Sequence, residues 1–228
     1  DSMRAAVAAS EPSMTALTLY LGLTGDPARF GFQGENHWIF TTWDHQEIAD
    51  RWAEALDGRP LGAYLSFPSM KDPTATRHTA EIITFACADG FAPWAGTEWM
   101  RRGETYAAMK ARVAAGLLDV VEQRWPGFGA LVDVQEVSTP LTVESFTGHC
   151  AGGIYGLAST PDRLRRRLTP AKTPVPGLLL AGADACALGV MGAVMGGVFA
   201  AGAALGPAGF PRIMGAASKR ASQAQSTR

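Results

Sequence analysis

Hydrophobic and polar residues alternate along the first third of the chain in a way that predicts β-strands. In "MTALTLYLGL", residues 14–23, a leucine stands at every second position from Leu17 to Leu23, which is the period of a half-buried strand. Two more runs, "GAYLSFPS" from Gly62 and "TAEIITFACA" from Thr79, also predict strands. Strand character returns in "LVDVQEVSTPLTVESF", residues 131–146.

Between these runs the apolar residues change to helical spacing. In "DHQEIADRWAEALDG" we expect Asp44 to cap a helix, with Glu47 at the third position of a capping box and Gly58 as the stop. A longer helix is predicted from Glu104 to Arg124, ended by "WPGFG". Its apolar face consists of Met109, Val113, Leu117, Val120 and Val121.

Strands interleaved with amphipathic helices predict an α/β protein in three parts. Residues 1–170 form the larger α+β part, with a mixed sheet, and we interpret it as a substrate-binding domain. Residues 171–206 read as a short strand, a turn and a helix. Residues 207–228 hold basic but no acidic side chains among Ser, Ala and Gln, and we expect this tail to be disordered.

Composition excludes several classes of function. The 20 basic and 21 acidic side chains give a net charge of -1, so no bulk electrostatic feature indicates nucleic acid binding. Cys87, Cys150 and Cys186 are far apart and form no CxxC or His-paired spacing. We therefore expect neither a disulfide scaffold nor a metal site, and a reducing, cytoplasmic location is the simpler assumption. The cluster Arg165–Arg167 has two interpretations, a solvated helix end or a contact with an anionic group.

The stretch "GLLLAGADACALGVMGAVMGGVFAAG", residues 177–202, permits two interpretations. Residues 185–205 carry no charge, and 21 residues are enough to cross a hydrocarbon core of about 30 Å. The first interpretation is therefore a tail-anchored membrane protein with this segment as its span. The many Gly and Ala residues, the strand-like start and the carboxylate of Asp184 at its border count against it.

The second interpretation is a ligand-binding turn between a strand and a helix. Ligands of open α/β sheets bind at the carboxyl ends of strands, and a helix that starts near Gly189 offers unpaired N–H groups there. Asp184 in the turn is suited to accept hydroxyls of a ribose or ribityl chain. Gly189, Gly192 and Gly196 recur on one helical face and allow a cofactor or a sheet to approach it closely.

The segment "TPVPGLLLAGADACALGVMGAVMGG", residues 173–197, resembles the C-terminal flavin-contact segment of FAD-dependent oxidoreductases. The family includes phytoene desaturases, carotenoid isomerases and retinol saturases, and the saturase branch is the most similar. Three upstream segments, "FPSMKDP", "RHTAEIITFA" and "STPLTVESFTGHCAGGIYGL", resemble the same family in the same order. The resemblance covers residues 15 to 206.

The resemblance implies an enzyme that uses FAD to act on carbon-carbon double bonds of an apolar isoprenoid, such as a carotenoid or retinoid, often in peripheral contact with a membrane. Asp184 would hold the ribityl hydroxyls, and the start of the helix would lie against the flavin. The implied cofactor-binding residues are Gly182, Ala183, Asp184, Gly189, Val190, Met191, Gly192 and Ala193.

One departure from the family is large, because the sequence lacks the strand followed by GxGxxG that binds the ADP half of FAD. The chain therefore looks like the C-terminal portion of such an enzyme. We expect it to bind FAD poorly by itself and to need a separate N-terminal FAD-binding portion.

The segment around "GGIYGL" contains the candidate proton carriers for double-bond chemistry. Its candidates are Glu144, His149, Cys150 and Tyr155, of which Tyr155 is preferred because a phenol suits an apolar pocket. Six tryptophans either line a substrate tunnel or, more simply, pack in the core. A third interpretation of the whole chain is a non-catalytic module that binds an apolar ligand.

Overall fold

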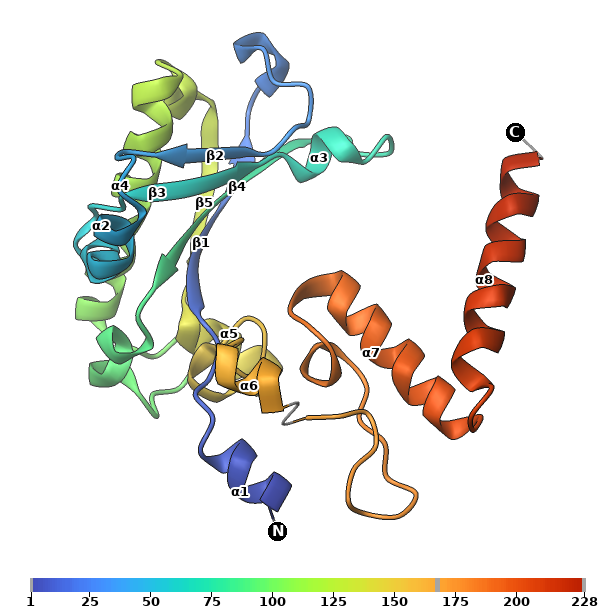
Figure 1. Cartoon of the computed structure of the whole chain (residues 1–228). Coiled ribbons are helices and arrows are strands. Elements are labelled where there is room, and N and C mark those ends of the chain that lie inside the picture. The colour runs from blue at the N-terminus through green and yellow to red at the C-terminus, as the bar shows by residue number, and fades with distance from the viewer. Residues whose placement is uncertain (1, 167–168, 227–228) are drawn as a thin grey trace. The chain divides into compact units, whose positions relative to one another are not determined.

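The computed structural model describes residues 2–166 and 169–226, which form two compact units. One unit comprises Met14–Ile154, and the other joins the N-terminal segment up to Ser13 to the chain from Tyr155 onwards. The division lies between Ile154 and Tyr155, earlier than the boundary that we expected at residue 170. Each unit is described by itself (Figure 1).

The larger unit is a sheet with helices. Its strands are β1 (Thr15–Leu23), β2 (His37–Phe40), β3 (Gly62–Ser66), β4 (His78–Ala86) and β5 (Val132–Ser138). Its α-helices are α2 (His45–Asp50), α3 (Pro68–Lys71), α4 (Glu104–Arg124) and α5 (Pro140–Thr147). The strands form a five-stranded sheet in the order β2-β3-β4-β1-β5.

The α/β class is confirmed, but the sheet is antiparallel in every described pairing and not mixed. The strands β3 and β4 are joined by a short connection that reverses the chain, whereas a parallel neighbour would require a long crossover. The predicted strand over residues 131–146 ends at Ser138. Its second half is the helix α5, with Pro140 in its first turn and a capping box between Thr139 and Thr142.

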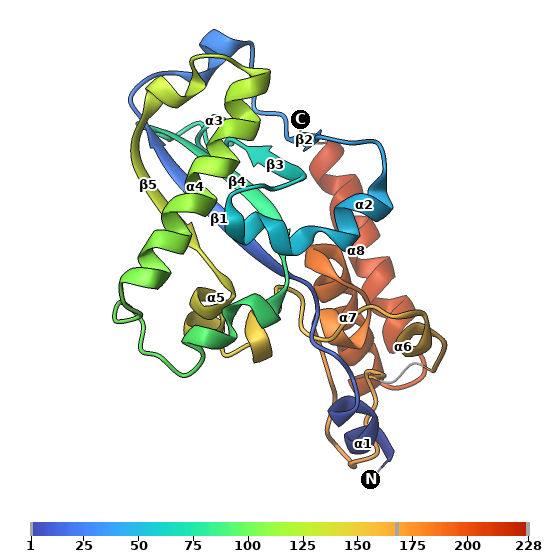
Figure 2. The same ribbon diagram turned by 90° about the vertical axis from the view of Figure 1, so that its left-hand side faces the viewer.

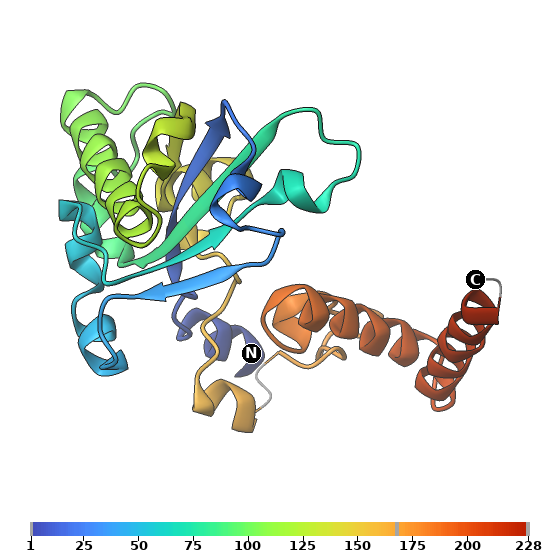
Figure 3. The ribbon, with the colours of Figure 1, turned by 90° about the horizontal axis from the view of Figure 1, so that it is seen from above.

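One face of the sheet is buried beneath α4, as Figures 2 and 3 show. The alternate leucines of β1 point to this face and are nearly inaccessible to solvent, as are Leu65 and Ile82. The predicted apolar face of α4 packs against them, and all five of its residues are buried. The helix ends at Arg124, and Gly127 then adopts φ 92°, as the "WPGFG" signal predicts.

The predicted helix after Asp44 is confirmed in part. The Asp44 carboxylate accepts hydrogen bonds from the N–H groups of Gln46 and Glu47, so the N-cap is correct. The Glu47 side chain, however, pairs with Arg51. The α-helix ends at Asp50 and a 3-10 helix, η2 (Trp52–Asp57), follows it. Gly58 stops η2 with φ 77°.

Close backbone packing joins η2 to α4. A Cβ atom built on Gly116 would lie 2.2 Å from the carbonyl oxygen of Gly58. Replacing Gly116 by Ala is therefore expected to lower the free energy of unfolding of this unit by about 1–3 kcal/mol, the usual cost of overpacking. Chemical denaturation monitored by circular dichroism measures the change. Gly215→Ala is the control, because nothing lies within 4 Å of a Cβ at that helical position. Equal stability of the two variants would contradict the packing described.

The smaller unit is helical. It contains α1 (Ser2–Ala8), α6 (Pro161–Arg166), α7 (Gly189–Ala204) and α8 (Gly209–Ser226), with a 3-10 turn, η6 (Ala183–Ala185), before α7. Among the described residues, the run after Gly177 forms no strand and has one isolated bridge, between Lys172 and Leu179. The predicted strand is therefore wrong here, because a strand buried on both faces needs neighbouring strands, and this unit provides none in its described part.

The tail is a helix over Gly209–Ser226, so the prediction of disorder is wrong for these residues. Its alanines favour a helix, and Phe210 stacks on Phe199 of α7 with ring centroids 5.7 Å apart. Residues 227 and 228 lie outside the described range. Across the described parts of the chain, no helix combines the length and apolarity that a bilayer crossing requires. The interpretation of residues 185–205 as a membrane span is therefore not supported, since the helix in this segment, α7, has 16 residues.

Candidate functional site

The turn before α7 has the order that the sequence predicts. Gly182 (φ 92°) opens η6, and Gly189 (φ 81°) starts α7. Both φ values lie in a region that glycine adopts without the steric cost of a side chain. Leu188 precedes α7 and provides no side-chain cap, so the N–H groups of the first turn remain available as donors.

Asp184 is the most highly connected residue of this turn. One oxygen of its carboxylate, Oδ1, accepts a 3.0 Å hydrogen bond from the Leu157 N–H and a 2.9 Å bond from Nη2 of Arg163. Its backbone carbonyl oxygen accepts from the same Nη2 and from the Thr169 hydroxyl. The Asp184 side chain is still 43% exposed, whereas that of Arg163 is 8% exposed.

These contacts bring together two segments that are 27 residues apart in sequence. Gly156, in "GGIYGL", has φ 80°, and a Cβ there would lie 2.4 Å from Oδ2 of Asp184. This close approach requires glycine at position 156. The carboxylate is thus fixed on its Oδ1 side by protein donors, while it also lines two surface cavities. Such an oxygen is suited to accept a ligand hydroxyl.

The sequence analysis missed Arg163. The basic cluster drew attention to residues 165–167, but Arg163 carries the ion pair with Asp184. Arg165 is exposed and donates to the Pro161 carbonyl. The side chain of Arg166 and all of Arg167 lie outside the described residues. Arg163 and Asp184 are brought together by the tertiary fold, so their spacing in the sequence does not indicate the ion pair.

The glycines of α7 have a different role from the one expected. A Cβ on Gly192 would lie 1.8 Å from the carbonyl oxygen of Ala187, and one on Gly196 would lie 2.0 Å from that of Gly182. The smooth helical face is therefore occupied by the backbone of the preceding turn and not by a cofactor or a sheet. Glycine is needed here for the turn to lie against its own helix.

The other side of α7 is apolar and uncovered. Val190 is 80% exposed and Met191 is 72% exposed, and Val194 is exposed as well. A helix that is apolar all round is normally buried. The exposed residues of its first turns therefore form a surface that favours contact with an apolar molecule or protein surface.

The four candidate proton carriers have different local surroundings. His149 Nδ1 lies 2.8 Å from the Gly153 carbonyl oxygen, which fits an ordinary loop histidine. Glu144 is exposed on the helix α5, and Cys150 is exposed in the 3-10 turn Cys150–Gly152. Tyr155 is 37% exposed and directly precedes Gly156, so it lies one residue from the segment that contacts Asp184. Its N–H donates to the Ser13 hydroxyl.

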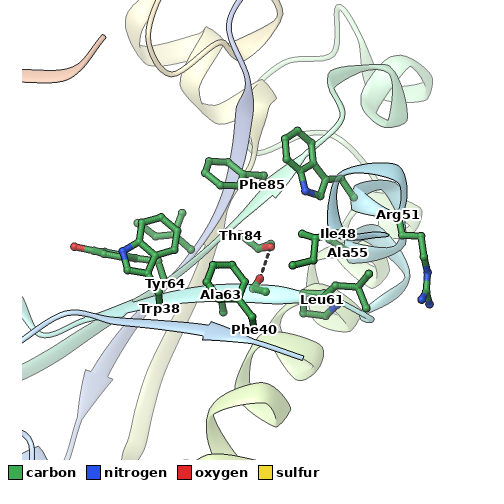
Figure 4. Close-up of a pocket in the computed structure, with 14 residues that line it drawn as sticks. Trp38, Phe40, Ile48, Arg51, Ala55, Leu61, Ala63, Tyr64, Thr84 and Phe85 are labelled. Carbon is green, nitrogen blue, oxygen red and sulfur yellow. Dashed lines mark hydrogen bonds between the residues drawn. The ribbon is translucent and has the colours of Figure 1, made fainter. Parts of the chain in front are cut away.

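An aromatic pocket lies in the larger unit (Figure 4). Trp38 stacks parallel to Phe40 at 6.2 Å and meets Tyr64 edge-on at 5.0 Å. On the neighbouring wall the Trp52 ring packs against Phe85 at 5.5 Å. The Trp52 Nε1 group is buried and has no hydrogen-bond partner among the described residues. The pocket therefore has largely apolar walls, and one of its lining residues contains a buried indole N–H without a hydrogen-bond partner among the described residues.

The six tryptophans lie in three kinds of surroundings. Trp94 and Trp125 pack against the core, and Trp43 and Trp99 are exposed. Only Trp38 and Trp52 line the aromatic pocket. The cysteines are free thiols, and in the described part of the chain no group of three or more His, Cys, Asp or Glu side chains could hold a metal ion.

The chain matches no family profile, but it has relatives among characterised oxidoreductases. The all-trans-retinol 13,14-reductase of Rattus norvegicus is 24% identical over 86% of this chain and 34% of its own length. The enzyme of the same name from Homo sapiens is 24% identical over 85% of this chain and 34% of its own length. An inactive all-trans-retinol 13,14-reductase from Danio rerio is 33% identical over 65% of this chain.

These similarities confirm the family resemblance found in the sequence. Over 65–86% of its length and at 23–33% identity, the chain is similar to proteins named all-trans-retinol 13,14-reductase, the saturase branch of the resembling family. The chain spans about a third of the length of these reductases.

Proposed function

We propose that this chain is the C-terminal part of an FAD-dependent oxidoreductase that acts on a carbon-carbon double bond of an isoprenoid. The observation that carries the proposal is the position of Asp184. Its carboxylate is held by Leu157 and Arg163 at the turn that opens α7. Two segments that resemble the flavin enzymes thus meet at one acceptor beside a helix N-terminus.

The residues of this turn fit the ribityl and isoalloxazine part of FAD. Asp184 is suited to accept ribityl hydroxyls, and the free N–H groups from Gly189 to Met191 are suited to an electron-rich ring edge. The uncovered Val190 and Met191 supply apolar contact. When bound, FAD supplies the hydride chemistry, and the protein supplies position and shields the reaction from water.

The exposed rings of Trp38 and Phe40, which line the aromatic pocket, are the proposed contact for part of the isoprenoid. These stacked rings favour a planar conjugated chain. The buried Trp52 Nε1 group has no partner among the described residues, and an oxygen on the ligand would relieve the cost of that unused donor. The retinol acted on by the named relatives carries such an oxygen.

We propose Tyr155 as the group that would donate a proton to one carbon of the double bond, with reduced FAD supplying the hydride for the other carbon. A chimera in which this chain replaces the aligned third of the rat reductase is the appropriate enzyme for the test. Tyr155→Phe is expected to lower its turnover of all-trans-retinol by about 10²-fold or more, the usual contribution of general acid catalysis. Absorbance of the saturated product, separated by chromatography, measures turnover.

The same variant should leave FAD binding unchanged, because the phenol is not among the proposed flavin contacts. His149→Ala is the control, since the His149 ring is held by a backbone carbonyl. Turnover that survives Tyr155→Phe but falls with His149→Ala would reverse the assignment.

The proposal includes dependence on a second portion of chain. The sequence has no GxGxxG after a strand, so this chain alone should bind FAD weakly. Addition of FAD to the purified chain, followed by gel filtration, tests this. A yellow, stoichiometric complex would contradict the dependence.

A second candidate function is a non-catalytic module that binds an apolar ligand. The Danio rerio relative favours it, because that protein is named inactive. Retinol binding to this chain without flavin, combined with absence of turnover in the chimera, would support this function over catalysis.

A further inference from the structure

The larger unit contains a second cavity, which shares no lining residue with the aromatic pocket. It is bounded by the start of α4, by α5, and by β1 and β5. Its lining includes Tyr20, Trp99, Arg102, Tyr106, Lys110 and Phe146. Neither the proposed flavin contacts nor the proposed proton transfer uses any of these side chains.

Arg102 is the charged group of this cavity that lacks a counter-ion. The residue is 9% exposed. Its Nη2 donates to the Leu141 carbonyl at 3.2 Å and to the Ser145 hydroxyl at 3.0 Å, both of which are neutral acceptors. Its Nε is fully buried and has no partner among the described residues. No carboxylate in the described part of the chain forms an ion pair with this guanidinium.

The other charges of the cavity do not compensate Arg102. Glu136 is engaged by Lys110, so this pair adds no net charge. Burial and the nearby Glu81 carboxylate raise the pKa of Tyr20, so its phenol stays neutral at physiological pH. The Tyr106 ring lies 5.4 Å from the guanidinium carbon, and its hydroxyl is occupied by Thr139 at 2.7 Å. The cavity thus has one uncompensated positive charge.

A buried cation without a counter-ion is costly in free energy. The cost falls if an anion binds, since hydrogen bonds between charged groups are roughly twice as strong as neutral ones. A single positive charge is matched by a monoanion. A phosphate near pH 7 carries a larger negative charge, which the paired Lys110 does not balance.

Apolar side chains surround the same cavity. Trp99 and Phe146 meet edge-to-face at 5.2 Å, although they are 53% and 67% exposed. Met100, between Trp99 and Arg101, is also exposed and has φ 67°, a conformation that is rare for a residue with a side chain and typical of binding sites. Exposed aromatic residues beside a buried charge favour a ligand with an apolar chain and a charged end.

We propose that this cavity binds an amphipathic monocarboxylate, such as a long-chain fatty acid. Arg102 binds the carboxylate, and Trp99 and Phe146 contact the first part of the apolar chain. None of the lining residues of this cavity belongs to the proposed flavin contacts or to the aromatic pocket. A carboxylate bound to Arg102 would also be linked to the helix α5, because Arg102 donates hydrogen bonds to the Leu141 carbonyl and the Ser145 hydroxyl of that helix.

Fluorescence titration with cis-parinaric acid and with its methyl ester tests the proposal on the full chain. The two probes share the apolar chain and differ in the charge. We expect the acid to bind at least about tenfold more tightly than the ester, the difference that a charged hydrogen bond supplies. This ratio is measured on the unmodified protein, so it does not depend on whether a variant folds.

Two matched substitutions locate the site. Arg102→Gln should remove the preference for the acid, whereas Arg101→Gln should keep it, because Arg101 is exposed and pairs with Glu98. Phe146→Ala, at an exposed position, should weaken acid and ester alike by about threefold or more, from the loss of apolar contact. Circular dichroism of each variant verifies its fold.

Equal affinities of acid and ester for the unmodified chain would overturn the proposal, as would the absence of binding of either probe. A preference for the acid that persists in folded Arg102→Gln would also overturn it, because the carboxylate would then lie elsewhere. If Arg102→Gln does not fold, the Phe146→Ala variant decides the location of the site. An affinity for the acid that is unchanged in Phe146→Ala would then overturn the assignment to this cavity.

Discussion

Replacing Asp184 by Ala in the chimera with the rat reductase is expected to weaken FAD binding by about 10- to 100-fold, the loss that accompanies a charge-assisted hydrogen bond. The carboxylate is the proposed acceptor for the ribityl hydroxyls. Its removal also leaves the guanidinium of Arg163, which is 8% exposed, without its carboxylate partner. Quenching of flavin fluorescence during titration measures the dissociation constant.

Two controls separate the ligand contact from the structural role of Asp184. Asp133→Ala removes an exposed carboxylate on β5 and should leave the affinity unchanged. Asp184→Asn keeps an oxygen acceptor and should therefore lose less affinity than the alanine variant. Unchanged FAD affinity in a folded Asp184→Ala variant would remove this residue from the flavin site.

The second large effect is expected at Gly196. A Cβ at this position would lie 2.0 Å from the carbonyl oxygen of Gly182, which is backbone and cannot rotate away. Gly196→Ala is therefore expected to lower the free energy of unfolding by about 1–3 kcal/mol and to displace the turn that carries Asp184. Thermal denaturation and FAD titration measure the two effects.

The adjacent glycine provides a close control. Gly197 lies on the same helix, and nothing lies within 4 Å of a Cβ built on it. Gly197→Ala should therefore be neutral or stabilising by about 0.5–1 kcal/mol, because alanine has the higher helix propensity. If both alanine variants have the same stability and the same FAD affinity, the turn does not depend on its approach to α7.

Strict alternation on a one-sided sheet makes β1 and β4 predictable from the sequence. β1 and β4 have this pattern because one face of each lies under α4 and the other does not. β2 was missed, since it has 4 residues and lies at the edge of the sheet. Such a short strand leaves too little sequence for its period to be recognised.

Two errors have specific physical causes. The helix α5 was interpreted as a strand because Thr142 and Val143 are β-branched, although Thr139-Pro140 is a good helix start whose capping box the structure contains. The run after Gly177 has the composition of a buried strand, but a strand also needs a partner, and among the described residues this run has a single bridge, between Lys172 and Leu179. Local pattern cannot predict whether a partner is present.

The candidate site could be predicted in part, because the order turn, carboxylate, glycine and helix is local. Gly189 begins α7 where the sequence places it. Arg163 and Gly156 could not be assigned a role, since both act through contacts with a residue more than 20 positions away. The roles of Gly192 and Gly196 were also misjudged, because a glycine pattern shows that something approaches closely but not what it is.

The most direct test of the central claim is the flavin content of two purified proteins. One is the chimera that carries this chain, and the other is the rat reductase with its aligned third deleted. The chimera should hold about one FAD per chain, as expected of a completed flavin site, and the deleted protein should hold far less. Equal flavin content in the two proteins, or a folded chimera without FAD, would contradict the claim that this chain completes a flavin site.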